Sequence, residues 1–146
     1  MTTTPRTPLP FALDIPFVQA LGMQLWRFDA GEAEISLDVR PEMRNSWAVA
    51  HGGVLMTLLD VVMAHAARSV RDADEQGVPG IVTVEMKTSF LRPATGRLVS
   101  TGKLLHGTPG MAFCEGSVRD EGGALCAHAT GTFKFLRALG RVGQIP

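Results

Sequence analysis

Alternating hydrophobic and polar positions predict strands in several segments of the chain. The clearest alternation runs over residues 32–40, where Ala33, Ile35, Leu37 and Val39 share one side and polar residues occupy the other. This pattern is typical of a strand with one face in water. Similar patterns, separated by turn-forming sequences such as RPATG, GTPG and DEGG, predict strands at 23–28, 80–91, 97–107, 111–120 and 124–135.

Two segments have helical features instead. Residues 53–71 are apolar on almost every side of a helix, which predicts a long helix covered on most sides. A shorter helix is predicted over 15–22, where Pro16 suits the first turn and Gly22 a C-terminal stop. We expect a loop over 41–53 and a polar connection over 71–80.

Consecutive strands joined by short turns favour an antiparallel sheet. We therefore predict an α+β hotdog fold, in which a curved antiparallel sheet of about six strands wraps around one long central helix. The predicted domain covers residues 11–137. Flexible tails are predicted at 1–10, which is rich in threonine and proline, and at 138–146.

Composition narrows the partners that such a domain can have. The chain of 146 residues has zero formal charge and no basic block, so we expect no nucleic-acid partner. It begins without a signal-peptide pattern, and its longest apolar run is interrupted by polar residues, so we expect a cytoplasmic protein outside the membrane. Cys114 and Cys126 are expected to be reduced core thiols. Without HExxH or clustered Cys and His, we expect no metal and no cofactor.

Asp60 is unusual because it lies in the middle of the apolar helix. Its helical neighbours are Met56, Thr57, Met63 and Ala64, so no cation lies one turn away. One interpretation is an Asp that faces solvent or a partner subunit, bonded to the backbone or to Thr57. The other is a general base or nucleophile whose reactivity is tuned by a dry site.

The residues before this helix favour the second interpretation. Gly52 and Gly53 would let backbone N–H groups at the helix start approach a ligand closely, which predicts an oxyanion hole. His51 and Asn45, taken alone, are ordinary loop residues. Their combination with Asp60 indicates a catalytic site.

Gly52 and Asp60 cannot act on the same carbonyl within one chain. They are separated by eight residues, roughly 12 Å along a helix at about 1.5 Å per residue. Two copies of the helix packed antiparallel about a two-fold axis would bring Gly52 of one copy to Asp60 of the other. We therefore predict a homodimer with two shared active sites.

The stretch MRNSWAVAHGGVLMTLLDVVMAHAA at 43–67, with TVEMKTSFLRPATG at 83–96, resembles the hotdog-fold acyl-CoA thioesterases, specifically the PaaI-like (phenylacetyl-CoA thioesterase) branch. The similarity of layout covers about residues 15 to 136. The resemblance implies hydrolysis of an acyl-CoA thioester to the free acid and CoA. It also implies a homodimer assembled as a dimer of dimers, whose packing the sequence leaves open.

The resemblance also implies roles for individual residues. Asp60 matches the base or nucleophile, and the Gly52 N–H matches the group that polarises the thioester carbonyl. Asn45 matches the side chain that helps to place the water or thioester, His51 the residue that shapes the loop, and Thr83 a residue that holds the water. Further expected substrate contacts are Gly53, Met63, Trp47 and Arg92, of which Trp47 departs from the family pattern. Arg92, Lys87 and Lys134 are candidates for binding the CoA phosphates.

Other functions remain open at this point. A serine hydrolase is disfavoured because the chain has no G-x-S-x-G sequence. A hydratase or dehydratase of the same fold, acting on acyl-CoA or an acyl carrier, is one alternative. A non-catalytic acyl-ligand binding module is another. Trp47, Phe90 and the methionines suit aromatic and medium-chain acyl groups equally.

Overall fold

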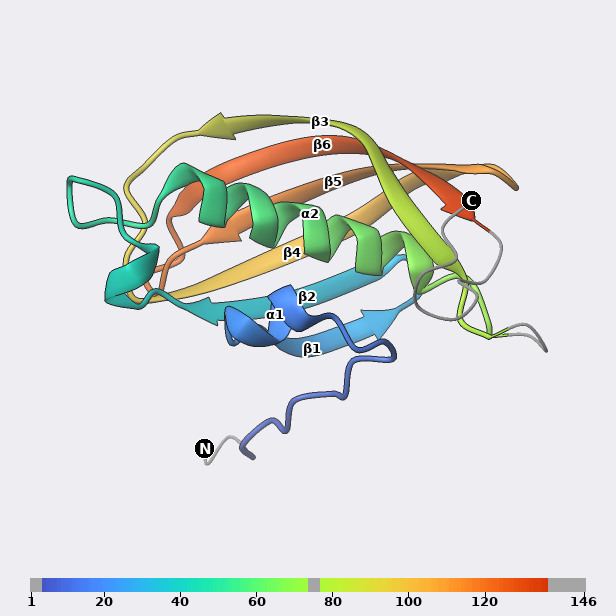
Figure 1. Ribbon diagram of the computed structural model, residues 1–146, viewed down its shortest axis with the longest axis horizontal. Helices are drawn as coiled ribbons and strands as arrows, with labels where there is room; N and C mark the ends of the chain where they lie inside the picture. The colour runs from blue at the N-terminus through green and yellow to red at the C-terminus, as the bar shows by residue number, and fades with distance from the viewer. Residues whose placement is uncertain (1–3, 74–76, 137–146) are drawn as a thin grey trace.

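The computed structural model describes residues 4–73 and 77–136. In these residues a six-stranded antiparallel sheet curves around one long helix (Figure 1). The helices are α1 (Pro16–Ala20), a short 3-10 helix η1 (Pro41–Met43) and α2 (Gly52–Arg68). The strands are β1 (Gln24–Asp29), β2 (Glu32–Asp38), β3 (Gly80–Phe90), β4 (Arg97–Gly107), β5 (Met111–Arg119) and β6 (Leu125–Leu136).

The sheet has the order β1-β2-β4-β5-β6-β3, and its concave face encloses α2. The helix contributes Leu58, Leu59 and Val62 to the core, all fully buried. Small residues on the strands let the helix come close to the sheet. At Gly102 on β4 a Cβ atom would lie only 2.5 Å from the Val62 carbonyl oxygen, so any larger residue there would push the helix away.

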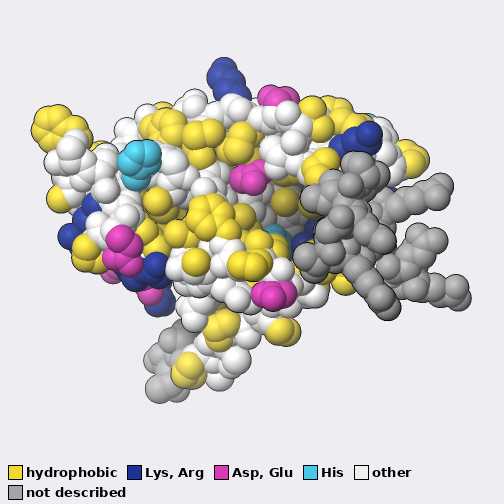
Figure 2. All heavy atoms as spheres, viewed as in Figure 1, with side chains coloured by type: hydrophobic (Ala, Val, Ile, Leu, Met, Phe, Trp, Pro, Cys, Tyr) yellow, Lys and Arg dark blue, Asp and Glu magenta, His cyan; other side chains and the backbone are white. Residues whose placement is uncertain are grey.

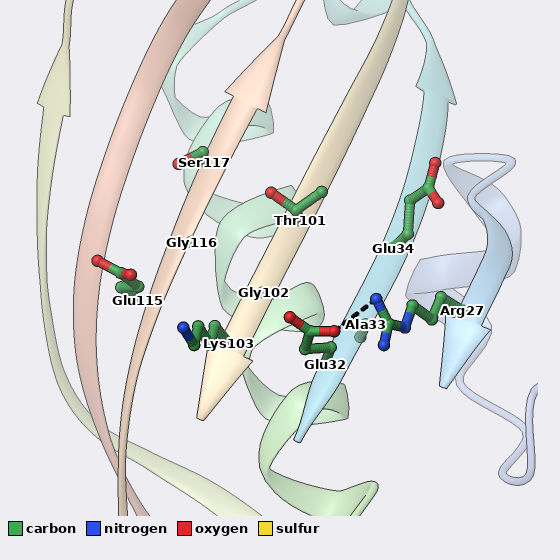
Figure 3. A pocket seen from close by; sticks show the side chains of 10 residues that line it. All are labelled: Arg27, Glu32, Ala33, Glu34, Thr101, Gly102, Lys103, Glu115, Gly116 and Ser117. Atoms are coloured by element: carbon green, nitrogen blue, oxygen red, sulfur yellow. Dashed lines mark ion pairs between the residues drawn. The ribbon is translucent and has the colours of Figure 1, made fainter. Parts of the chain in front are cut away.

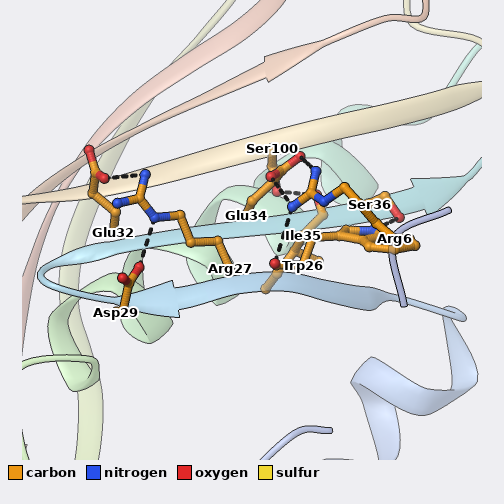
Figure 4. A network of polar contacts seen from close by, with 9 residues as sticks. All are labelled: Arg6, Trp26, Arg27, Asp29, Glu32, Glu34, Ile35, Ser36 and Ser100. Atoms are coloured by element: carbon orange, nitrogen blue, oxygen red, sulfur yellow. Dashed lines mark hydrogen bonds and ion pairs between the residues drawn. The ribbon is translucent and has the colours of Figure 1, made fainter. Parts of the chain in front are cut away.

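The structure confirms the predicted hotdog arrangement, with small differences in element bounds. The helix predicted over 53–71 begins one residue earlier and ends at Arg68. The loop predicted over 41–53 contains η1. Ser36, on the predicted wet face of β2, is buried because the indole Nε1 of Trp26 donates a hydrogen bond of 2.8 Å to its Oγ (Figure 4).

The N-terminal segment lies against the β1 edge of the sheet. The Leu9 N–H donates to the Leu25 carbonyl at 2.7 Å, and the guanidinium of Arg6 contacts both the Glu34 carboxylate and the Trp26 carbonyl (Figure 4). Residues 4–10 of the predicted N-terminal tail therefore make tertiary contacts. The predicted C-terminal tail at 138–146 and residues 1–3 lie outside the described residues, and the domain bounds stay a prediction.

Cys114 and Cys126 are buried free thiols, as the sequence predicts. Burial raises the pKa of the Cys114 thiol to about 12, so it stays protonated and unreactive near neutral pH. Within the described ranges, no helix is long and apolar enough to cross a membrane. The same part of the chain contains no cluster of three His, Cys, Asp or Glu side chains suited to a metal ion.

Candidate active site

The N-terminus of α2 presents an unused backbone donor at Gly52. His51 is the N-cap: its Nδ1 accepts a hydrogen bond of 2.9 Å from the Gly53 N–H, and its carbonyl accepts one from Val54. The N–H of Gly52, the first helical residue, donates to no other residue in 4–73 or 77–136. The dipole and this free donor give the helix start an affinity for negative charge. The sequence prediction of an oxyanion donor at Gly52 therefore has a geometric basis.

Asn45 organises the loop before α2. Its side-chain Oδ1 accepts hydrogen bonds from the N–H groups of Trp47, at 2.9 Å, and Val49, at 3.4 Å. The side-chain NH₂ group is thereby turned to the other side of the amide, where a ligand can use it. Trp47 itself lies on the loop with 83% of its surface exposed.

The structure brings Asn45, Gly52 and Arg92 together around one open hollow. Its volume is about 400 Å³. The remaining lining residues are mainly apolar and come from the loop, α2 and the end of β3: Val49, Ala50, Leu55, Phe90, Leu91, Pro93 and Ala94. An apolar hollow with a few polar groups at a helix start is a typical small-molecule site.

Asp60 lies in the middle of α2 and is half-buried. The hydroxyl of Thr83 on β3 donates a hydrogen bond of 2.5 Å to Asp60 Oδ1. None of the ion pairs formed by the described residues includes Asp60. The carboxylate is thus oriented through one oxygen, while its second oxygen is left for another partner. The sequence expected Thr83 near the site but did not indicate a direct bond to Asp60.

Some predicted site residues lie elsewhere. Met63 is fully buried in the core beneath Gly116 and Gly131, so it does not line an open acyl pocket in this chain. Trp47 and Asp60 do not line the hollow at Gly52. Asp60 stands about two helical turns along α2, as the spacing of roughly 12 Å predicts.

Phe90, one of several residues that the sequence analysis considered for an acyl group, lines the hollow beside Gly52. A Cβ atom on Gly52 would lie 3.3 Å from the edge of its ring, so the aromatic ring packs closely against Gly52. Phe90 ends β3 and Gly52 begins α2, so only the tertiary fold brings them together. The apolar pair Phe90-Leu91 before the Arg-Pro turn was the available signal.

A second hollow, on the outer face of the sheet, has a different character (Figure 3). It is lined by charged and hydroxyl side chains, among them Arg27, Glu32, Lys103 and Glu115, and Arg27 forms an ion pair with Glu32. None of the predicted site residues lines it. We therefore place the candidate site on the α2 side of the sheet.

Residues 48–127, more than half of the chain, match the family model of the thioesterase superfamily. The chain belongs to the thioesterase superfamily. The resemblance to hotdog thioesterases noted in the sequence is thereby confirmed, and the matched region includes Gly52, Asp60 and Thr83. Thioester hydrolysis is the activity of this class of enzymes.

Individual members of the superfamily support the assignment. The medium/long-chain acyl-CoA thioesterase YigI of Escherichia coli is 29% identical over 84% of this chain and 87% of its own length. The putative esterase Rv1847 of Mycobacterium tuberculosis is 30% identical over 73% of this chain and 76% of its own.

Solved structures agree with the fold. The conserved protein PA5202 of Pseudomonas aeruginosa has a TM-score of 0.75 and 30% identity, covering 84% of this chain and 95% of that one. The PaaI protein of E. coli has a TM-score of 0.74 over 87% of this chain and 86% of that one. It is 22% identical, so this likeness shows the shared fold alone.

Proposed function

We propose that this thioesterase hydrolyses acyl-CoA thioesters with aromatic or medium-chain acyl groups, at a site shared between two copies of the chain. The observation that carries the proposal is the half-buried Asp60 carboxylate, which accepts a hydrogen bond from Thr83 and forms no ion pair with any residue of 4–73 or 77–136. The resemblance of the chain to YigI, which is named as a medium/long-chain acyl-CoA thioesterase, supports acyl-CoA thioesters as the class of substrate.

The proposed reaction uses few groups. The Gly52 N–H donates to the thioester carbonyl oxygen and stabilises the negative charge that develops there. In one route the free oxygen of Asp60 removes a proton from a water that attacks the carbonyl carbon; the carbon–sulfur bond then breaks, and CoA leaves as a thiolate that takes up this proton. In the other route the Asp60 oxygen attacks the carbonyl carbon itself and displaces the CoA thiolate, forming a mixed anhydride. A water then hydrolyses the anhydride, which releases the free acid, regenerates the Asp60 carboxylate and supplies the proton that the thiolate takes up. The Asn45 NH₂ group helps to place the water or the thioester, and His51 keeps the loop and helix start in position.

The sheet edges support a shared site. The N-terminal segment covers β1, whereas β3 is an edge of 11 residues with Val82 and Val84 exposed. Figure 2 shows hydrophobic side chains gathered on the face that α2 and β3 present. Such an edge is normally covered, and a second copy would cover it. Antiparallel packing of two α2 helices would then bring Gly52 of one copy to Asp60 of the other.

Several finer assignments belong to the same proposal. Arg92, exposed beside the hollow, is proposed to contact the CoA phosphates, and Trp47 and the Gly53 backbone to contact substrate. We propose a homodimer that assembles as a dimer of dimers. Because both cysteines are buried free thiols, we place the enzyme in the cytoplasm, where thiols stay reduced.

The test is thiol release from a panel of aliphatic and aromatic acyl-CoA thioesters. Asp60→Asn keeps the shape of the side chain but removes the base, so kcat should fall by about 10²–10⁴-fold. Glu115→Gln, a matched change on the outer face of the sheet, should leave kcat unchanged. Gel filtration checks that Asp60→Asn keeps the assembly of the wild type. Wild-type rates in Asp60→Asn would contradict the proposal.

The wild-type enzyme and the same acyl-CoA assays also distinguish a hydrolase from the two alternatives, a hydratase and a non-catalytic binding module. Hydration of an enoyl-CoA without thiol release would identify a hydratase. Tight binding of acyl-CoA with neither reaction would identify a binding module. Either result would contradict the proposal that Asp60 acts in thioester hydrolysis.

A further inference from the structure

The hollow at the start of α2 is lined by residues of the loop before the helix, of α2 and of the end of β3. Seven of its ten lining residues are apolar, and they meet Gly52, the proposed oxyanion donor. We infer that this hollow holds the acyl group of the thioester and that Phe90 sets the acyl length that the enzyme accepts. The inference rests on the proposed function, because it takes the carbonyl of the substrate to lie at the Gly52 N–H.

Contacts place Phe90 at the junction between the carbonyl position and the hollow. Three atoms of its ring lie 3.3, 3.5 and 3.9 Å from the point where a Gly52 Cβ atom would be. A group that extends from a carbonyl bound at Gly52 into the hollow must therefore pass along this ring. About half of the Phe90 surface, 52%, is exposed, so the ring can contact a ligand without displacing core side chains.

The polar groups around the hollow accommodate an apolar acyl chain. The Ala50 N–H donates to the Ala94 carbonyl, and the N–H groups of Leu91 and Arg92 both donate to the Cys126 carbonyl. The guanidinium of Arg92 donates to the Leu125 carbonyl at 2.8 Å. These donors are already paired, so an apolar acyl chain lying against them would leave none of them without a partner.

The volume of the hollow supports the same occupant. About 400 Å³ is near the lower end of the range of roughly 300–1,000 Å³ usual for ligand pockets. This space is large enough for one aromatic or medium-chain acyl group. The inferred ligand is thus an apolar acyl group.

Two substitutions at Phe90 test the inference in opposite directions. Phe90→Ala enlarges the hollow, and each additional buried methylene contributes roughly fourfold in binding. For acyl groups two carbons above the wild-type optimum, kcat/KM should therefore rise roughly sixteenfold relative to that optimum. Phe90→Trp narrows the hollow and should move the optimum to shorter acyl groups. Phe113→Ala removes an exposed aromatic that does not line the hollow, and should leave the length profile unchanged.

The profile is measured as kcat/KM over acyl-CoA thioesters from two to sixteen carbons, after gel filtration and thermal unfolding of each variant. Phe90→Leu, a smaller change, keeps the test available if Phe90→Ala does not fold. A length profile that is the same in the wild type, Phe90→Leu and Phe90→Trp would overturn the inference. So would a uniform rise in KM at every length, which would place the CoA arm in the hollow. Absence of hydrolysis in the wild type would instead contradict the proposed function.

Discussion

Gly52 contributes a backbone group to the candidate site, so its effect must be tested through the backbone. It is the first residue of α2, where proline is well accepted because the N–H there has no helical partner. The preceding residue, His51, has a ψ of 140°, an extended conformation that a following proline permits. Proline at this position can therefore remove the N–H while the helix keeps its start.

We predict different outcomes for Gly52→Ala and Gly52→Pro. Both add a Cβ atom close to the Phe90 ring, but only proline removes the donor. Loss of one oxyanion donor typically costs about 10²–10³-fold in kcat. Gly52→Pro should therefore be slower than Gly52→Ala by that factor, with equal helix content by circular dichroism. Equal rates in the two variants would mean that the Gly52 N–H does not bind the reacting oxygen.

At the scale of the helix, α2 has a polar end that the apolar pattern does not explain. His65 and Arg68 are only 3% and 4% exposed. The rings of Phe11 and Phe28 meet His65 edge-on, and the guanidinium of Arg68 lies over Phe28. Burial, with a smaller effect of the Arg68 charge, lowers the pKa of His65 to about 4, although its hydrogen bond to the Val61 carbonyl acts in the opposite direction. His65 is therefore neutral in the folded protein.

The lowered pKa of His65 predicts a loss of stability in mild acid. The unfolded state takes up a proton near pH 6.5, whereas the folded state does so near pH 4, so the free energy of unfolding falls as the pH decreases through this window. Between pH 7 and pH 5 the wild type should lose about 2 kcal/mol more than His65→Met. Urea unfolding at both pH values measures this difference. Parallel pH dependence in the two proteins would show that His65 titrates normally.

Periodicity predicted the elements because hydrophobic spacing reflects which face of each segment is buried. It failed where a neighbouring strand changes that burial, as at Ser36 on β2, which is buried and accepts a hydrogen bond from the Trp26 indole of β1. The glycines at the start of α2 and the isolated Asp60 were recognisable because their chemistry is local. The contacts of Thr83 with Asp60 and of Phe90 with Gly52 join β3 to α2, and no short-range pattern encodes such pairings.

At the scale of the whole molecule, one chain holds two separate halves of the proposed site. Gly52 and the hollow lie at the start of α2, and Asp60 with Thr83 lies about two turns further along. Both halves contact β3, the edge strand of the sheet beside α2 (Figure 1): Thr83 is bonded to Asp60, and Phe90 packs against Gly52. This separation is expected if the Gly52 half of one copy lies against the Asp60 half of a second copy.

A shared site predicts complementation between two inactive variants. A chain with Asp60→Asn still supplies Gly52, and a chain with Gly52→Pro still supplies Asp60. When the two are co-expressed in equal amounts and assemble at random, about a quarter of the sites receive both intact groups, so about a quarter of wild-type activity should appear. Each variant expressed alone, and the two mixed after purification without subunit exchange, serve as controls. If both groups acted within one chain, every site would lack one of them, and the co-expressed sample would stay as inactive as its controls.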